Sequence, residues 1–326
     1  MSSLLIPRDI ITNYEEGVFQ CPYCGTRMAL TNAEPLEASN CPNCEKLIMF
    51  PHKISHYWLF QVLGGGGMGI VYKAFHEHHH RSVYAVKILP RHARQNRRLF
   101  LALQREAQMS TRFAGHPTIV NVVAHGWSDG EYFMASEYIK GETLTARIDR
   151  LGCLDELEAL NITLDLLGAV QFVASKSYLY RDLKPDNVLV NDQGRAFLLD
   201  FGLCLPRIVA ARDLGDVIEA SPIYVPPERL VGEGEDVRSE IYSLGMLLYQ
   251  AALGCTYFNA KEADSLLRQH VSQFRLSDSL TRLDKLTPDL GAVVSKMIKR
   301  QPQDRYQDCR SLAADLQALV AVRLPA

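Results

Sequence analysis

Short runs of apolar residues, separated by glycine or polar residues, mark the first regular elements of the chain. The runs cover residues 57–63, 70–75 and 83–89. Apolar runs of this length that are bounded by turn-forming residues are typical of β-strands. Five of the six residues between the first two runs are glycine. The pattern therefore predicts a glycine-rich hairpin that is followed by a third strand.

Longer segments with helical spacing follow these strands. Residues 97–112 predict a helix in which Phe100, Leu101, Leu103 and Ala107 are among the less polar positions. Further helices are expected over residues 155–175 and in the long apolar stretch 241–253. We therefore expect an α+β fold class, because strands dominate the early part of the chain and helices dominate the later part.

The candidate chemistry lies in the later part. Asp182, Asn187 and Asp200 stand at a spacing that phosphoryl transfer can use. Such a transfer needs a metal ion that positions the phosphates and a group that orients the acceptor hydroxyl. Asp182 could accept and orient the hydroxyl, while Asn187 and Asp200 could hold Mg²⁺ or Mn²⁺. The alternative interpretation is an aspartate-rich turn after a helix.

Over about residues 57–322 the chain resembles the eukaryotic-type Ser/Thr protein kinases of bacteria. The segments that carry this resemblance are Gly64–Val71, Val83–Leu89, Tyr180–Asn187, Asp200–Gly202 and Pro226–Glu228. The resemblance implies a two-lobed protein kinase fold, with a small lobe of antiparallel strands and one main helix and a large lobe that is mainly helical. We expect the small lobe at residues 56–140, the large lobe at 141–326, and ATP in the cleft between the lobes.

The resemblance also implies catalytic roles for four residues. Asp182 would be the base, and Lys184 would contact the transferring phosphate, which favours a Ser/Thr acceptor in a protein substrate. Lys87 would contact the α- and β-phosphates of ATP and pair with Glu106, nineteen residues later. A plain solvent-facing position is the alternative for Glu106.

The implied ATP contacts are Leu63, Gly64, Gly66, Gly69, Val71, Ala85, Lys87, Glu137, Ile139 and Leu189. The three glycines lack Cβ and would let backbone N–H groups close over the phosphates. The backbone of Glu137 and Ile139 would face the adenine edge. Ser136 falls at the position that guards the back of this site, which predicts a pocket there unless a neighbouring side chain refills the space.

Three further positions bear on the large lobe. Arg305 is the expected partner of Glu228, and their pairing would anchor the segment before residue 228. Glu240 replaces the aspartate that usually supports the catalytic-loop backbone, so an extra methylene must be accommodated. Tyr180 replaces the usual histidine; its ring would fill an apolar column beside Phe201, and its hydroxyl would need a partner.

The segment between Gly202 and Pro226 has Ser221 and Tyr224 as its only hydroxyl-bearing residues. Both match the stretch that shapes the acceptor site, so a switch phosphothreonine is not expected there. Arg181, which would receive such a phosphate, is nevertheless present. We hypothesise that Asp213, Asp216 or Glu219 supplies a permanent negative charge to Arg181. Solvated loop acids are the alternative.

Cysteines in two closely spaced pairs suggest a separate module over residues 17–50, after a tail at 1–16. The spacing C-x₂-C-x₁₆-C-x₂-C of Cys21, Cys24, Cys41 and Cys44 is typical of a four-thiolate structural Zn²⁺ ribbon. About forty residues cannot bury enough apolar surface to fold unaided, so folding of this ribbon should need zinc. A disulfide or a thioredoxin-like redox site is the alternative.

The overall charge limits the partners that the ribbon could have. The net charge of −2 argues against a large phosphate-binding surface, so we expect a protein partner at the ribbon and no nucleic acid. Neither a signal peptide nor a membrane span is expected, which predicts a cytoplasmic protein.

One predicted turn is crowded with histidines, namely His76, His78, His79 and His80. A solvated loop is favoured there over a metal site.

Two other functions remain open at this point. An ATP-binding pseudokinase scaffold would be favoured if Tyr180 or Glu240 disorganised the catalytic loop. A zinc-ribbon nucleic-acid module with an incidental kinase fold would be favoured by tight, salt-sensitive binding to DNA or RNA.

Overall fold

A six-stranded antiparallel sheet organises the early part of the chain, with the strand order β5-β6-β7-β8-β10-β9. Its strands are β5 (His52–Ile54), β6 (Tyr57–Gly66), β7 (Gly69–His76), β8 (His79–Ile88), β9 (Val122–Ser128) and β10 (Glu131–Glu137). Leu59, Ala74 and Val86 are among the buried side chains that form one apolar core of this sheet. The period-two alternation of the strands places these side chains on one face.

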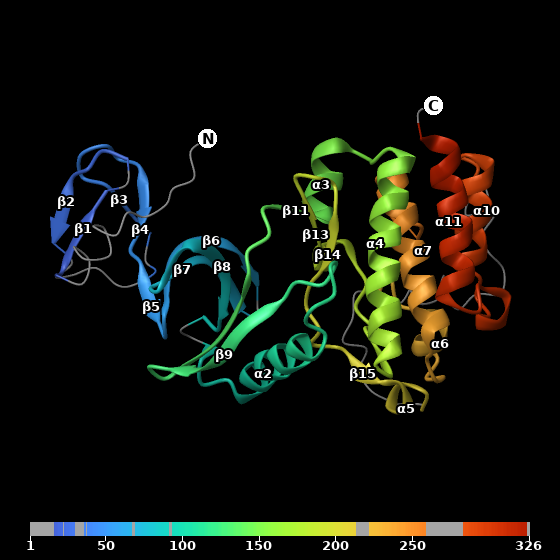
Figure 1. The fold of residues 1–326 in the computed structure, drawn as a ribbon, viewed down its shortest axis with the longest axis horizontal. Coiled ribbons are helices and arrows are strands. Elements are labelled where there is room, and N and C mark those ends of the chain that lie inside the picture. The colour runs from blue at the N-terminus through green and yellow to red at the C-terminus, as the bar shows by residue number, and fades with distance from the viewer. Residues whose placement is uncertain are drawn as a thin grey trace. The chain divides into compact units, whose positions relative to one another are not determined.

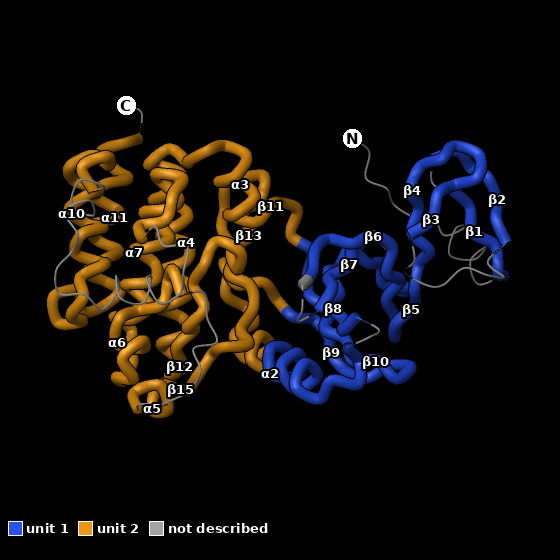
Figure 2. The backbone as a smooth tube through the Cα atoms, turned by 180° about the vertical axis from the view of Figure 1, so that it is seen from behind, with its two compact units in different colours: residues 1–107, 122–138 blue, residues 108–121, 139–326 orange. Residues whose placement is uncertain are grey.

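The computed structural model describes residues 16–21, 23–29, 36, 38–66, 69–90, 93–212, 222–258 and 283–324. The chain divides into two compact units, which Figure 2 shows in different colours. Unit 1 consists of residues 1–107 and 122–138, and unit 2 consists of residues 108–121 and 139–326.

The predicted glycine-rich hairpin is confirmed by the pairing of β6 with β7. Gly65 lies opposite Ile70, and Gly66 lies opposite Gly69. Gly69 has a φ of +144°, and a Cβ there would lie 3.1 Å from the carbonyl oxygen of Ile88 and 3.2 Å from two side-chain atoms of Lys87. Glycine is therefore required at residue 69 by both its backbone conformation and the close approach of β8.

The predicted helix over residues 97–112 is confirmed as α2 (Arg97–Arg112). Leu103 and Ala107 are buried and pack with Leu89, Tyr132 and Met134 of the neighbouring strands. These two helix positions lie four residues apart and so share one face of the helix. Leu103 and Ala107 thus belong to the face that covers the sheet, whereas the apolar Leu101 is exposed.

Two small antiparallel hairpins precede the sheet in unit 1. The first pairs β1 (Val18–Gln20) with β2 (Arg27–Ala29), and the second pairs β3 (Ala38–Asn40) with β4 (Leu47–Met49). Their shared core consists of the buried residues Phe19, Cys21, Cys41, Ile48 and Phe50, with Met28 and Cys44 packed against them. So few apolar side chains supply little folding free energy on their own.

Unit 2 is mainly helical and contains short strands. Its helices are α3 (Leu144–Leu151), α4 (Glu156–Ser175), α5 (Arg207–Ala210), α6 (Pro227–Leu230), α7 (Val237–Leu253), α10 (Pro288–Met297) and α11 (Cys309–Arg323). The short elements are β11 (Gly141–Thr143), β12 (Tyr178–Leu179), η2 (Pro185–Asn187), β13 (Val188–Asn191), β14 (Ala196–Leu198), β15 (Leu205–Pro206) and η3 (Pro302–Asp304). In Figure 1, α4, α7 and α11 run side by side, and both α7 and α11 pack against α4.

Local signals set the ends of the two longest helices in unit 2. The side chain of Asp155 accepts a hydrogen bond from the backbone of Glu158 and caps the start of α4. Asp236 and Ser239 form a capping box at the start of α7. Gly254, with a φ of +71°, ends α7 in the left-handed conformation.

Helix α4 is also the one helix among the described residues that is long and apolar enough to span a membrane, with a mean hydropathy of 1.4. Half of this apolar segment of α4 is buried inside the protein. Helix α4 has 20 residues, and the predicted apolar helix at 241–253 lies within α7, which has 17. We interpret α4 as a core helix, because nine of its residues are buried.

Residues 108–121 fall inside the expected small lobe but group with unit 2. Phe113 and Ile119 are buried in the core of unit 2, and Leu198 donates to the carbonyl oxygen of Thr118 at 2.8 Å. The β-rich early part and the helical later part nevertheless confirm the predicted α+β class.

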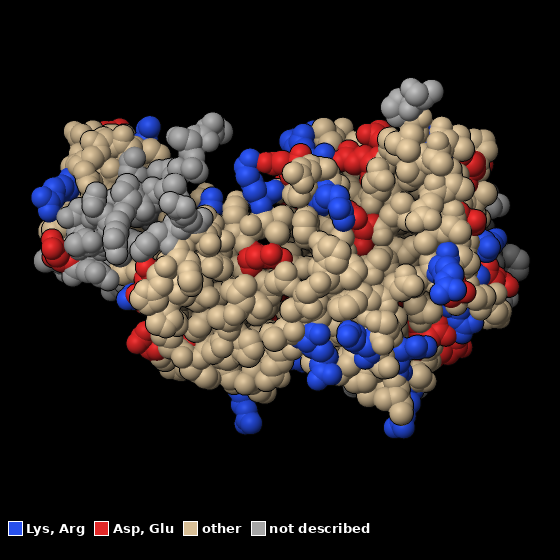
Figure 3. Space-filling model, in the orientation of Figure 1, with Lys and Arg blue, Asp and Glu red and all other residues tan. Residues whose placement is uncertain are grey.

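Charged side chains of both signs are interspersed on the face shown in Figure 3. Neither sign covers this face among the residues drawn in colour. This distribution agrees with the nearly balanced content of 35 Lys and Arg residues and 37 Asp and Glu residues.

Candidate functional site

The loop between β12 and β13 brings together three of the predicted catalytic and metal-binding residues. Lys184 Nζ donates to Asp182 Oδ2 at 2.8 Å, and Asn187 Nδ2 donates to the same oxygen at 2.7 Å. Asn187 Nδ2 also donates to the backbone carbonyl of Asp182 at 3.0 Å. Burial raises the pKa of Asp182, and the neighbouring Lys184 and Asn187 oppose this rise. The result is a buried carboxylate with a fixed orientation and a cation at its side.

Two non-glycine residues of this site adopt left-handed backbone conformations. The φ angle is +72° at Arg181, immediately before Asp182, and +49° at Asp200. Such conformations cost about 1–3 kcal/mol for most residues and persist only where the surrounding structure holds them. At Asp200, the carboxylate accepts a hydrogen bond from the backbone N–H of Gly202 at 3.0 Å.

Glu240 holds the backbone of the loop that contains Asp182, as expected. The N–H of Arg181 donates to Glu240 Oε1 at 2.9 Å. The longer side chain is therefore accommodated without loss of this contact. Because Glu240 is fully buried, its pKa rises to about 7, although the hydrogen bond from Arg181 favours the ionised form.

Tyr180 fills the apolar column that the sequence predicted. Its ring packs edge-on against Phe201, with a centroid distance of 5.1 Å and an interplanar angle of 73°. Its hydroxyl donates to the carbonyl oxygen of Leu199 at 2.5 Å. Phe201 also contacts Phe113, with ring centroids 5.2 Å apart. Tyrosine at residue 180 therefore keeps both the packing and a partner for its polar end.

A pocket opens within unit 2 beside the loop that contains Asp182. It is lined by Arg181, Asp182, Leu183, Lys184, Tyr224, Val225, Arg229 and Ser243. The pocket gives a small polar group access to the surroundings of the Asp182 carboxylate. An acceptor hydroxyl is a group of this size and polarity.

Lys87 and Glu106 form the ion pair that the sequence predicted. Lys87 Nζ lies 2.8 Å from Oε1 and 2.6 Å from Oε2 of Glu106. The pair joins β8 to α2 within unit 1, and both side chains are largely shielded from solvent, with exposures of 13% and 9%. A pair in this environment is screened less by salt than a surface pair is.

The other predicted ATP contacts divide between the two units. In unit 1, Val71 lies opposite Lys87 on the neighbouring strand, and the hydroxyl of Ser136 donates to the carbonyl oxygen of Ala85 at 3.3 Å. In the same unit, Leu63 is exposed near the end of β6, Gly64 and Gly66 belong to that strand, and Glu137 ends β10.

Two of these predicted contacts belong to unit 2. Leu189 lies in β13, between Thr143 of β11 and Phe197 of β14. Ile139 follows the end of β10 and is half-buried. The pairing of β13 with both neighbours fixes the position of Leu189 in its small sheet.

A buried charge cluster that the sequence did not reveal surrounds Arg181. Glu235 is buried, and its Oε1 lies 2.7 Å from Arg181 Nη2. Its other oxygen lies 2.6 Å from Arg229 Nη2. The only sequence signal was an acidic residue ahead of a long helix, which is too common to indicate a partner. Asp213, Asp216 and Glu219, which we proposed for this role, lie outside the described residues.

The predicted pair of Glu228 and Arg305 is confirmed. Arg305 Nη1 and Nη2 donate to Oε1 and Oε2 of Glu228 at 2.8 and 2.7 Å. Both side chains are buried, with exposures of 0% for Arg305 and 2% for Glu228. Ser239 adds a hydrogen bond to Glu228 Oε1 at 2.6 Å. The two parallel contacts give this pair a defined geometry.

The four cysteines of the small hairpins converge on one point. Their sulfur atoms all lie within 4.8 Å of one another, and two of the Sγ–Sγ distances are 3.7 Å for Cys21–Cys44 and 3.6 Å for Cys24–Cys41. Four sulfurs bound to zinc at about 2.3 Å in a tetrahedron would be separated by about 3.8 Å. The donor set and its spacing therefore fit a zinc ion.

Two similar turns supply these cysteines. Gly25 N–H donates to the carbonyl of Cys21 at 2.9 Å, and Glu45 N–H donates to the carbonyl of Cys41 at 2.9 Å. The φ angles of Gly25 and Glu45 are +76° and +56°. Glycine suits this conformation at residue 25, whereas Glu45 adopts it at a cost.

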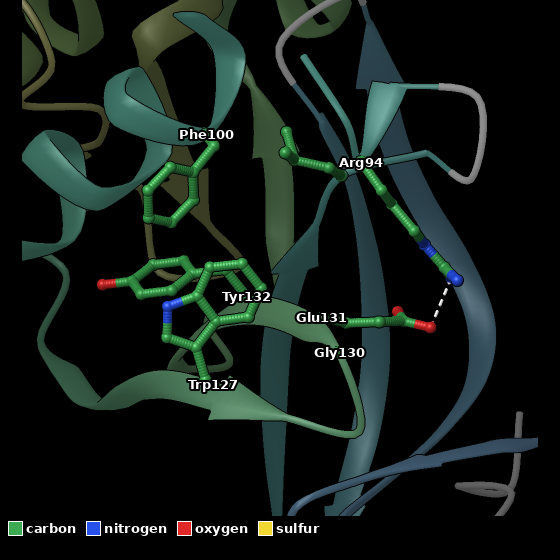
Figure 4. A pocket seen from close by; sticks show the side chains of 7 residues that line it. Arg94, Phe100, Trp127, Gly130, Glu131 and Tyr132 are labelled. Atoms are coloured by element: carbon green, nitrogen blue, oxygen red, sulfur yellow. Dashed lines mark ion pairs between the residues drawn. The ribbon is translucent and has the colours of Figure 1, made fainter. Parts of the chain in front are cut away.

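A second pocket is lined by residues of helix α2 and of the six-stranded sheet and its loops (Figure 4). The rings of Phe100, Trp127 and Tyr132 gather on one side of it, and Arg94 pairs with Glu131 on the other. Leu89 and Gly130 complete the lining. None of the predicted ATP contacts lines this pocket, so it is separate from those residues.

Comparison with known proteins agrees with this geometry. Residues 57–316 match the protein kinase domain family. The chain is 31% identical over 275 residues to the serine/threonine-protein kinase PknB of Mycobacterium leprae, a match that covers 82% of this chain and 43% of that protein. It is 28% identical over 266 residues to a probable serine/threonine-protein kinase of Clostridium perfringens, covering 81% of this chain and 38% of that protein. The chain thus spans less than half the length of these relatives.

Proposed function

The chain belongs to the protein kinase domain family, and from this premise we propose that it is a serine/threonine protein kinase. It would transfer the γ-phosphoryl group of Mg-ATP to a serine or threonine hydroxyl of a protein substrate. The observation that carries this proposal is the arrangement at Asp182, whose Oδ2 is held by both Lys184 and Asn187. This arrangement leaves a buried carboxylate beside a pocket that can admit a hydroxyl group.

We assign the proton transfer to Asp182. Its carboxylate orients the acceptor hydroxyl and takes its proton as the hydroxyl oxygen bonds to the γ-phosphorus. The bond from that phosphorus to the bridging oxygen breaks, and ADP leaves with the electron pair. The raised pKa of Asp182 makes it a better proton acceptor than an exposed aspartate, while Lys184 favours its ionised form and faces the transferred group.

The residues implied by the family resemblance would hold the nucleotide and the metal. Bound magnesium or manganese supplies charge neutralisation for the phosphates, and Asn187 and Asp200 have the oxygen donors that such an ion prefers. Lys87, which is oriented by Glu106, would contact the α- and β-phosphates. Gly69, where the approach of β8 leaves no room for a Cβ, belongs to the hairpin that would cover the phosphates.

The test is transfer of labelled γ-phosphate from Mg-ATP to the protein itself and to a generic basic protein, followed by phosphoamino-acid analysis. Asp182→Asn should abolish the transfer. Asp186→Asn is the matched control, because Asp186 is an exposed aspartate of the same loop that contacts Thr145. Phosphoserine or phosphothreonine that disappears only in Asp182→Asn supports the proposal.

A protein that binds Mg-ATP but transfers no phosphate would instead support the pseudokinase scaffold. That alternative rested on disorder of the catalytic loop caused by Tyr180 or Glu240. Both residues make the contacts that the loop needs, so this structure gives the scaffold no specific support.

We further propose that Cys21, Cys24, Cys41 and Cys44 hold a structural zinc ion. The supporting observations are the spacing of their sulfurs and the small apolar core of the two hairpins. Hydrogen bonds from Thr26 lower the pKa of Cys24 to about 5, whereas burial and the neighbouring cysteines raise the pKa of Cys44, so Cys24 is the ligand that most readily supplies the thiolate that zinc binds. Because these ligands must stay reduced, the proposed location of the protein is the cytoplasm.

The ribbon is proposed to dock a protein partner or to regulate the kinase. Steady-state kinetics with a generic substrate can separate these roles when Cys41→Ser is compared with the unchanged chain. An unchanged kcat would support docking, because a generic substrate has no need of the ribbon. A changed kcat at equal protein stability would support regulation.

A further inference from the structure

Two turns at one end of the six-stranded sheet lie side by side. Ser55 and His56 connect β5 to β6, and Glu77 and His78 connect β7 to β8. The backbone N–H of Glu77 donates to the carbonyl oxygen of His56 at 2.8 Å. This hydrogen bond fixes the spacing of the two turns independently of their side chains. Residues that lie twenty-one positions apart in the sequence are thus neighbours.

The side chains of these turns converge on one carboxylate oxygen. His56 Nδ1 contacts Glu77 Oε1, and His78 Nε2 lies 3.4 Å from the same oxygen. The candidate ligand atoms of His56, Glu77 and His78 all lie within 4.8 Å of one another. His56 and His78 are exposed, with side-chain exposures of 57% and 68%, so an ion from solution can reach them.

Further imidazole rings surround this group. The ring of His76 lies 5.6 Å from that of His56 and 5.7 Å from that of His78, measured between centroids. The ring of His79 lies 4.7 Å from that of His76. His76 Nδ1 accepts a hydrogen bond from the backbone N–H of His78 at 3.2 Å, which holds the ring of His76 beside the cluster.

We propose that His56, Glu77 and His78 form a binding site for a transition-metal dication such as Zn²⁺, Ni²⁺ or Cu²⁺. Imidazole nitrogens with one carboxylate oxygen are ligands that these ions prefer, whereas Mg²⁺ and Ca²⁺ prefer oxygen ligands. The ion would bind Glu77 through Oε1 alone, and water or His76 would complete its coordination. It would tie the β5–β6 turn to the β7–β8 turn, separately from the four-cysteine site.

Lys53 limits the affinity of this site. Its Nζ lies 2.7 Å from Glu77 Oε2, so it occupies the second carboxylate oxygen and repels a cation nearby. The ammonium also lies 5.6 Å from the centroid of the Trp58 ring. Replacement of Lys53 by methionine keeps an unbranched apolar side chain there and removes the repulsion.

The experiment uses the full chain with its ribbon loaded with one equivalent of zinc, in excess Mg²⁺. Titration calorimetry with further Zn²⁺ should detect one additional site. Co²⁺ added to the same protein should give weak visible absorption without thiolate charge-transfer bands, which separates this site from the cysteines. His56→Gln and His78→Gln should each weaken binding about tenfold or more, because each removes one of three protein ligands.

Two further variants complete the test. His125→Gln is the control, because His125 is an exposed histidine of unit 1 that lies outside the cluster and contacts the Tyr132 hydroxyl at 2.9 Å. This variant should bind the additional Zn²⁺ as tightly as the unchanged chain. Lys53→Met should bind the ion more tightly. The proposal would be overturned if His56→Gln and His78→Gln bound the additional Zn²⁺ as tightly as the unchanged chain. It would also be overturned if the unchanged chain bound this ion only at millimolar concentration. Circular dichroism of the metal-free variants shows whether they are folded.

Discussion

The guanidinium of Arg181 is paired with the buried carboxylate of Glu235, with 2.7 Å between Nη2 and Oε1. Arg229 binds the other oxygen of Glu235 and donates to the backbone carbonyl of Arg181 at 2.9 Å. Because Arg181 directly precedes Asp182 in the sequence and has a left-handed backbone, this cluster holds the conformation on which the position of Asp182 depends. Arg181 is thus paired with a permanent carboxylate from Glu235, a residue other than Asp213, Asp216 and Glu219, for which we hypothesised this role.

Replacement of Glu235 by glutamine should lower kcat between about tenfold and a hundredfold. The change leaves two partly buried arginines without their shared anion and loosens the loop beside Asp182. Glu233→Gln is the matched control, since Glu233 is an exposed acid two residues away. Steady-state kinetics measure kcat for both variants, and the fall in kcat is expected only for Glu235→Gln.

If Glu235 supplies the charge that Arg181 needs, treatment of the unchanged protein with a phosphatase should leave its kcat unaltered. Equal turnover of Glu235→Gln and the unchanged chain would contradict the proposed role of Glu235. Loss of activity on phosphatase treatment would show that a phosphate is needed in addition to this carboxylate.

The free energy of unfolding should depend on the ionisation of Glu240. Its pKa rises from 4.5 to about 7 in the folded protein because it is buried. The folded state therefore holds this proton more tightly than the unfolded state, and stability falls as the pH rises from 4.5 to about 7. At pH values above about 7, the free energy of unfolding should be lower than at acidic pH by up to about 3 kcal/mol.

Glu240→Gln removes the titration and keeps an oxygen that can accept from the N–H of Arg181. Urea unfolding over a series of pH values should show a stability difference that grows in favour of glutamine through the same window. If the free energy of unfolding changes with pH in the same way for both proteins, Glu240 keeps an ordinary pKa in the folded state.

Loss of either partner of the Glu228–Arg305 pair should destabilise the protein by about 3–5 kcal/mol, because an unpaired charge would remain buried. Urea unfolding of Glu228→Gln and Arg305→Met measures this, with the exposed Arg310→Gln as the control. The double variant should lose less stability than the sum of the single variants, because neither charge remains. Additive losses would argue against direct coupling of the two side chains.

Removal of zinc should unfold the region of residues 17–50, since zinc contributes on the order of 10 kcal/mol to such sites. Hydrogen exchange should then become fast in β1 to β4 and stay slow in β7 and β8, whose core does not include the cysteines. Cys21→Ser should behave like the chelated protein, whereas Cys255→Ser, which changes an exposed cysteine outside the ribbon, should not. Unchanged exchange after complete removal of metal would show that the hairpins fold without zinc.

The sequence by itself determined the local elements and the identity of the candidate catalytic groups. The glycine-rich hairpin of β6 and β7 and the helices α2 and α4 follow from interactions within a few residues, which a local pattern encodes. The pairs Lys87–Glu106 and Glu228–Arg305 were also predictable, but only through the resemblance to a known family, because nothing local specifies a partner nineteen or seventy-seven residues away.

Only the tertiary structure decided which other charged groups meet. Glu235 reaches Arg181 from a loop fifty-four residues later in the chain, and His56 reaches Glu77 because two hairpin turns are adjacent in one sheet. The left-handed backbone at Arg181 and Asp200 is likewise stabilised by distant contacts and opposes local preference. Such features depend on packing between remote segments, and the amino acids near each residue carry too little information to specify them.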